Sequence, residues 1–189
     1  MKKILLFASG AGSNVENIIR YFKNTPDVSV VGVFSNNAEA KVLDKAKNHN
    51  IPTFVFNRMQ LSEGLVLDRI KQLQPDLIVL AGFLWKMPEQ IVAAYPNKII
   101  NIHPALLPKY GGKGMYGMNV HNAVLENKEK ETGITIHFVN EHYDEGEFIF
   151  QQSVTVDDCA TAEEIAAKVH ELEHLHFPQV IEKIVNPKS

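Results

Sequence analysis

The residues best suited to chemistry are an asparagine and a histidine two positions apart. Asn101 lies within the apolar run Ile99–Ile102, and His103 follows it directly, before Pro104 turns the chain away. Side chains two positions apart in a strand leave the same face, so this amide and imidazole emerge together. Both can donate hydrogen bonds to an oxyanion, and the imidazole can also transfer a proton, which indicates acyl transfer. A buried pair satisfied by backbone carbonyls is the structural alternative.

A glycine-rich turn, Ser9–Asn14, follows the first apolar run and precedes a helical pattern. Free N–H groups at such a helix start bind anions. The dinucleotide fingerprint is incomplete, because Val15 stands at the third glycine position and Ser35–Asn37 carries no acidic residue for a ribose. The turn therefore favours a single phosphate group. The alternative is an ordinary turn in which Ser13 only caps the helix.

A third candidate is Asp144, in the polar segment between two late apolar runs. A carboxylate folded over His103 would raise the pKa of that imidazole and could accept a proton through water. The alternative is a solvated acidic loop.

Alternation of apolar runs with helical spacing predicts the elements that position these residues. Strands are expected at Ile4–Ala8, Val28–Phe34, Thr53–Phe56, Leu77–Ala81, Ile99–Ile102, Gly133–Val139 and Phe148–Val156. Helices are expected at Asn14–Lys23, Ala38–Asn48, Ser62–Leu73, Pro88–Ala94, Val120–Asn127 and Thr161–Val185, the last bent at Pro178. The pattern predicts an α/β fold: a doubly wound, mostly parallel, Rossmann-like sheet with helices on both faces and an antiparallel C-terminal strand pair.

Composition narrows the function classes. The 189 residues suit a single domain, 1–189. A formal charge of -3 argues against a nucleic-acid partner, and the apolar runs are too short for a membrane span. A single cysteine, Cys159, excludes an internal disulfide and favours the cytoplasm.

Taken together, several motifs resemble the folate-dependent formyltransferases that act on glycinamide ribonucleotide. The resemblance covers nearly the whole chain. It is carried by Ser9–Asn14, Phe34–Asn36, Leu80–Phe83, Asn101–Pro104, Leu106–Tyr110 and His137–Asp144. It implies formyl transfer from 10-formyltetrahydrofolate to the amine of glycinamide ribonucleotide in purine biosynthesis, by a monomer or homodimer and without a metal.

The resemblance also implies roles for individual residues. The catalytic residues would be Asn101, His103 and Asp144. The ribonucleotide would be bound by Gly12, Ser13, Asn14, His170, Glu171, Leu172 and Glu173. The folate would be bound by Leu84, Trp85, Lys86, Met87, Asn101, Asn140, Glu141, His142, Tyr143 and Asp144. The stretch Ser62–Leu65 stands where some members place an arginine near the folate, and no residue is assigned there.

Three rival functions are open at this point. His170–His174 matches the zinc-protease motif, but the metzincin continuation is absent and Glu182 lies about 12 Å further along an ideal helix. A hydrolase that releases formate from formylfolate would use the same cluster, although the phosphate turn argues against it. A nucleotide-sensing module would bind ligand without turnover.

Overall fold

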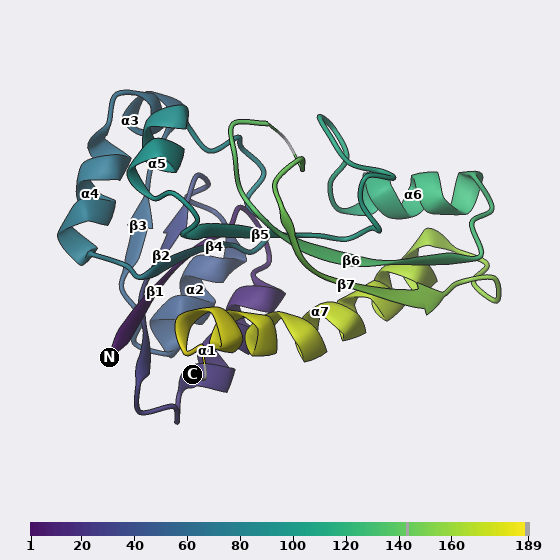
Figure 1. Cartoon of the computed structure of the whole chain (residues 1–189), viewed down its shortest axis with the longest axis horizontal. Helices are drawn as coiled ribbons and strands as arrows, with labels where there is room; N and C mark the ends of the chain where they lie inside the picture. Colours follow the sequence, from purple (N-terminus) through teal and green to yellow (C-terminus); the bar gives the residue numbers. More distant parts are fainter. Residues whose placement is uncertain (143, 188–189) are drawn as a thin grey trace.

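The computed structural model describes residues 1–142 and 144–187, and within them one sheet has the strand order β3-β2-β1-β4-β5-β6-β7 (Figure 1). The strands are β1 (Lys2–Phe7), β2 (Val28–Ser35), β3 (Thr53–Val55), β4 (Leu77–Leu80), β5 (Ile99–His103), β6 (Glu131–Phe138) and β7 (Phe148–Thr155). Neighbours from β3 to β5 pair in parallel, whereas β6 pairs antiparallel with both β5 and β7. The predicted fold class, including the antiparallel pair at the C-terminal end, is confirmed.

Helices cover both faces of the sheet. They are α1 (Ser13–Phe22), α2 (Lys41–Asn48), α3 (Arg58–Ser62), α4 (Leu65–Leu73), α5 (Glu89–Ala94), α6 (Met118–Glu126) and α7 (Ala162–Val185). Alternate side chains of β1 enter two separate cores: Ile4 and Leu6 pack with α1, α2, α6 and α7, whereas Leu5 and Phe7 pack with α3, α4 and α5. Both cores follow from the period of two along a strand buried on both sides. No helix among the described residues is both long and apolar enough to cross a membrane.

Several helices differ from the sequence expectation, α1, α5 and α6 by only one or two residues at their ends. The helix expected over Ser62–Leu73 is two helices, because Gly64 lies between them with a φ of 96°. Asn57 starts α3 with a capping box, which explains why that helix begins earlier than expected. The second helix begins at Lys41 rather than Ala38. Pro178 lies inside α7 and is buried, and the helix continues through it to Val185.

Candidate active site

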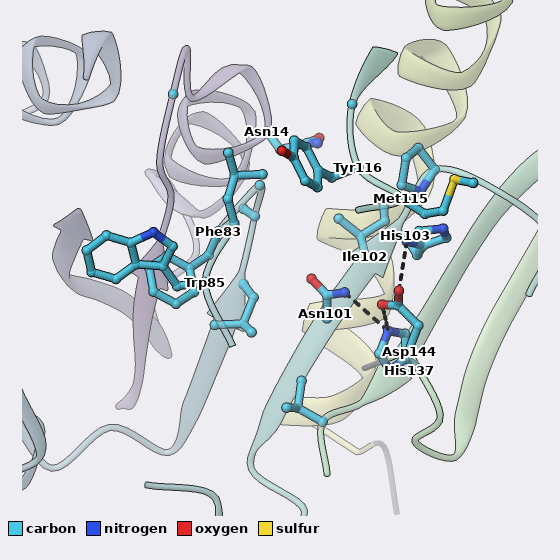
Figure 2. Close-up of a pocket in the computed structure, with 18 of the residues that line it drawn as sticks. Asn14, Phe83, Trp85, Asn101, Ile102, His103, Met115, Tyr116, His137 and Asp144 are labelled. Atoms are coloured by element: carbon cyan, nitrogen blue, oxygen red, sulfur yellow. Dashed lines mark hydrogen bonds and ion pairs between the residues drawn. The ribbon is translucent and has the colours of Figure 1, made fainter. Parts of the chain in front are cut away.

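A cavity of about 620 Å³ opens at the carboxyl ends of β1, β4 and β5. Ligands bind at this edge in doubly wound sheets. The cavity is lined by the turn after β1 (residues 10–14), the segment after β4 (80–87), the end of β5 (101–104), the loop before α6 (112–117), and residues of β6, the β6–β7 connection, α6 and α7. Figure 2 shows Phe83 and Trp85 across the cavity from the polar cluster of Asn101, His103, His137 and Asp144.

Asn101, His103 and Asp144 all line this cavity. Nε2 of His103 lies 2.7 Å from the backbone oxygen of Tyr110, and because a carbonyl only accepts, that nitrogen carries a proton. Nδ1 of His103 faces Oδ2 of Asp144 at 3.6 Å, beyond hydrogen-bonding distance. Nδ1 is therefore the nitrogen of this imidazole that a substrate or a water molecule can engage.

The expected rise in the pKa of His103 is wrong. His103 is only 4% exposed, and its burial lowers the pKa below the usual value. The carboxylate of Asp144 and the carbonyl of Tyr110 act in the expected upward direction, but they are outweighed. For Asp144 burial would raise the pKa, yet contacts with His137, His103 and the N–H of Gly112 lower it overall, so this carboxyl is ionised at neutral pH.

A second histidine, which the sequence prediction did not assign, joins this cluster. His137 is the β6 partner of Asn101 and is 2% exposed. Its Nδ1 donates to the backbone oxygen of Phe138 at 2.9 Å, which leaves Nε2 to accept from the amide of Asn101 at 3.2 Å. The same Nε2 lies 3.6 Å from Oδ1 of Asp144. One amide hydrogen of Asn101 is thus held by His137, and the other remains for a ligand.

The turn after β1 leaves the start of α1 without a side-chain cap. Gly12 precedes α1 with a φ of 69°, and a Cβ there would lie 2.3 Å from Cγ2 of Val42, so only glycine fits. No side chain caps α1, so Ser13 does not act as the cap that the structural alternative required. The N–H groups of the first helical turn therefore face the cavity without a side-chain acceptor.

The Asn14 side chain joins this turn to α7. Its Nδ2 donates to Oε2 of Glu173 at 2.9 Å, and Nε2 of His170 lies 3.7 Å from the same oxygen. Burial raises the pKa of Glu173, and the contacts with Asn14 and His170 oppose that rise. Of the four α7 residues predicted to bind substrate, His170 and Glu173 line the cavity. Glu171 is exposed and Leu172 packs against the core, so neither lines it.

The segment after β4 forms a wall of the cavity that we call the aromatic wall, because it carries Phe83 and Trp85. All four residues that the sequence led us to expect at the folate line the cavity: Leu84, Trp85, Lys86 and Met87. Ser9 fixes this segment by accepting from the N–H of Leu84 at 2.9 Å. Across the chain, Asn140 and His142 line the cavity, Glu141 does not, and Tyr143 lies outside the described residues.

A cation lies beside this wall that the sequence did not reveal. The guanidinium of Arg58 stacks over the ring of Trp85 at 4.4 Å from its centroid. A smaller cavity, of about 500 Å³, adjoins the first and is lined by both residues together with Lys86. Arg58 stands ahead of the stretch in which an arginine was sought, at the start of the unexpected helix α3.

The zinc-protease motif of residues 170–174 lies on α7, beside the cavity. The rings of His170 and His174 stack with their centroids 5.8 Å apart. Within residues 1–142 and 144–187 there is no group of three or more histidine, cysteine or acidic side chains placed to hold a metal ion. Instead, His170 and Glu173 face the cavity.

Comparison with known proteins gives a consistent match. The family model described as "Formyl transferase" matches residues 2–181. The phosphoribosylglycinamide formyltransferase of Bacillus subtilis is 35% identical over 191 residues, which cover 98% of this chain and 95% of that protein. A chloroplastic enzyme of the same name from Arabidopsis thaliana is 39% identical, and a second from Vigna unguiculata is also 39% identical. The chain spans 64% and 61% of the lengths of these two plant proteins.

Solved structures agree in fold. The crystal structure of phosphoribosylglycinamide formyltransferase from Anaplasma phagocytophilum superposes with a TM-score of 0.90 at 35% identity, covering 99% of this chain and 88% of that one. The enzyme of the same name from Brucella melitensis gives a TM-score of 0.88 at 36% identity, covering 100% of this chain and 97% of that one.

Proposed function

Because this chain belongs to the formyl transferase family, we propose that it moves a formyl group from 10-formyltetrahydrofolate to the amine of glycinamide ribonucleotide. The products are formylglycinamide ribonucleotide and tetrahydrofolate, and the step belongs to de novo purine biosynthesis. One observation carries the proposal: Asn101, His103 and Asp144 share a cavity with an uncapped helix start suited to a phosphate. A metal-free acyl transfer to a phosphorylated amine needs both parts.

The ribonucleotide occupies the side of the cavity between the first turn of α1 and β5. Its phosphate accepts from N–H groups of Gly12, Ser13 and Asn14. Glu173, held by the Asn14 amide, is the polar group beyond the phosphate and contacts the sugar. His170, at the rim beside Glu173, adds a donor close to the phosphate. The amine is then directed toward the end of β5.

The reaction needs one new C–N bond and the loss of another. The substrate amine attacks the formyl carbon and gives its proton to Nδ1 of His103 or to a water molecule. The oxyanion of the tetrahedral intermediate accepts from the free N–H of Asn101 and from the Nδ1–H that the imidazole has gained. The C–N bond to the folate then breaks. The proton lost by the amine reaches the leaving folate nitrogen through Nδ1 of His103 or a water molecule, and the carboxylate of Asp144 stabilises the imidazolium on the way.

The folate lies against the aromatic wall. Backbone groups of residues 84–87 and 140–142 supply hydrogen bonds to the pterin, and Met87 and Trp85 supply apolar surface. Arg58 and Lys86, at the adjoining smaller cavity, place positive charge where the carboxylates of the folate tail leave the site. We propose further that residues 1–189 form one catalytic domain, active in the cytoplasm as a monomer or homodimer.

The test combines one assay with one pair of variants. Purified protein is mixed with formyltetrahydrofolate, and folate release is measured with and without glycinamide ribonucleotide. Release should require the ribonucleotide, whereas release that ignores it would make the protein a hydrolase. His103→Ala should reduce turnover at least ~100-fold and leave ribonucleotide binding nearly intact. The control is His176→Ala, since His176 lies against Phe150 outside the cavity and should turn over as the wild type does.

A further inference from the structure

The mechanism above leaves one buried imidazole of the cavity unused. His121, on α6, lines the cavity and is 6% exposed. Its Nδ1 is fully enclosed and has no hydrogen-bond partner among the described residues. The side-chain oxygen of Asn14, which lines the same cavity, is enclosed and unpaired in the same way. An unpaired buried polar atom costs about 1–3 kcal/mol, so histidine is kept at this position at a cost to stability. Its other ring nitrogen, Nε2, is not enclosed in this way and is the atom left for a ligand of the cavity.

Two further histidines, His170 and His103, line the same cavity as His121. Burial lowers the pKa of His121 to about 4, and the charges of His170 and His103 add to this effect. His170 stands beside Glu173 at the phosphate end, and His103 is the proton-transfer residue at the other end. His121 lines the same cavity as both residues and lies on α6, directly after the lining loop of residues 112–117, so a ligand that runs from the α1 turn to His103 passes it.

The chemistry of His121 differs from that of a phosphate ligand. At neutral pH the ring is uncharged, so one nitrogen donates and the other accepts. A neutral group of this kind matches a hydroxyl, which also donates and accepts, better than it matches an anion. Its helix is well anchored, because Val120 and Val124 beside it are both 0% exposed. The ring is therefore held in place before a ligand arrives, which lowers the entropy lost on binding.

We propose that His121 is a specificity-determining contact of this site, which pairs with a sugar hydroxyl of the bound ribonucleotide. The inference rests on the proposed function, because it takes the ribonucleotide to run from the α1 turn to His103. The contact is made through Nε2, the ring nitrogen that is not fully enclosed. The sugar is the only part of glycinamide ribonucleotide that presents hydroxyl groups between its phosphate and its amine.

The experiment measures binding separately from turnover. Wild type, His121→Leu and His121→Gln are titrated calorimetrically with glycinamide ribonucleotide, ribose 5-phosphate and inorganic phosphate. His121→Leu should weaken the first two ligands about tenfold, the loss of one hydrogen bond, and leave phosphate unchanged. His121→Gln keeps a polar group near the position of Nε2 and should restore most of the affinity. The control is Asn122→Leu, the exposed neighbour that does not line the cavity.

The outcomes separate a binding role from a structural one. The thermal midpoint of His121→Leu without ligand should equal or exceed that of wild type, because the leucine removes an unpaired buried nitrogen. Unchanged affinity for ribose 5-phosphate, or an equal loss for inorganic phosphate, would overturn the proposal. A lowered midpoint with unchanged affinities would also overturn it. Failure of the proposed function is a different result: wild type would bind ribose 5-phosphate but not formylate glycinamide ribonucleotide.

Discussion

Replacement of Asp144 by asparagine tests the electrostatics of the site most directly. The carboxylate lies 3.6 Å from Nδ1 of His103 and 3.6 Å from Nε2 of His137, and it accepts from the N–H of Gly112 at 3.0 Å. Its backbone has a φ of 55°, a left-handed conformation that asparagine tolerates and alanine does not. Asp144→Asn therefore removes the charge while keeping the backbone and the bond to Gly112.

The size of the effect follows from the geometry. Two unit charges 3.6 Å apart interact by about 5 kcal/mol at an effective dielectric constant of 20. The amide dipole of asparagine recovers part of that energy. If about half is lost when the imidazolium forms in the transition state, turnover falls roughly 50- to 70-fold. Affinity for the ribonucleotide should change little, since the proposed phosphate site lies at the other end of the cavity.

The same substitution should also shift the pH dependence of turnover, in a direction set by the pKa of His103. Burial already lowers the pKa of His103, and Asp144 opposes that effect. Without the carboxylate the pKa falls further, so the protonated imidazole persists only at lower pH. Since the neutral imidazole accepts the proton of the amine, the pH below which turnover declines should move down in steady-state profiles of Asp144→Asn relative to wild type. Turnover within threefold of wild type, or a shift of this limb to higher pH, would refute the reasoning.

Three further outcomes are expected. A Cβ on Gly146 would lie 1.6 Å from the backbone oxygen of Phe138, so Gly146→Ala must displace the β6–β7 connection. Turnover should fall at least ~10-fold while ribonucleotide affinity is kept, and normal turnover would contradict the clash. Glu173→Gln should raise KM for the ribonucleotide about tenfold without lowering the thermal midpoint of unfolding. The glutamine oxygen still accepts from Asn14, and no buried carboxyl group remains. A lower midpoint in thermal denaturation would count against this account. Chelators should leave turnover unchanged, whereas about one zinc per chain in metal analysis would restore the protease interpretation of residues 170–174.

The parts of the fold and site that the sequence predicts are those set by local periodicity. The run Ile99–Ile102 has the composition of a buried strand, and a period of two is enough to place Asn101 and His103 on one side of it. The turn after β1 is equally local, since Gly12 and the start of α1 adjoin in sequence. The helix break at Gly64 is the exception, because a glycine within a helical pattern signals either a weak point or an end.

The parts that escaped prediction depend on distant segments. His137 meets Asn101 only through the antiparallel register of β5 and β6, and no local pattern of either strand fixes that register. The pKa of His103 was misjudged because a carboxylate is visible in the sequence, whereas the burial that outweighs it comes from packing. Arg58 at the start of α3 stacks on Trp85 in the segment after β4, and no spacing rule in the sequence connects these two positions.

The order of the strands also fixes the distance between the two ends of the site. The turn proposed to bind the phosphate follows β1 and His103 ends β5, with β4 as the single strand between them. Adjacent strands lie about 4.8 Å apart, so the two ends of the site are separated by roughly 10 Å across the sheet. Main-chain hydrogen bonds between the strands set this separation, and a side-chain substitution does not change it. A phosphorylated amine of clearly different length should therefore be a poor substrate, and an insertion or deletion beside β1 or β5 is the change expected to alter that preference.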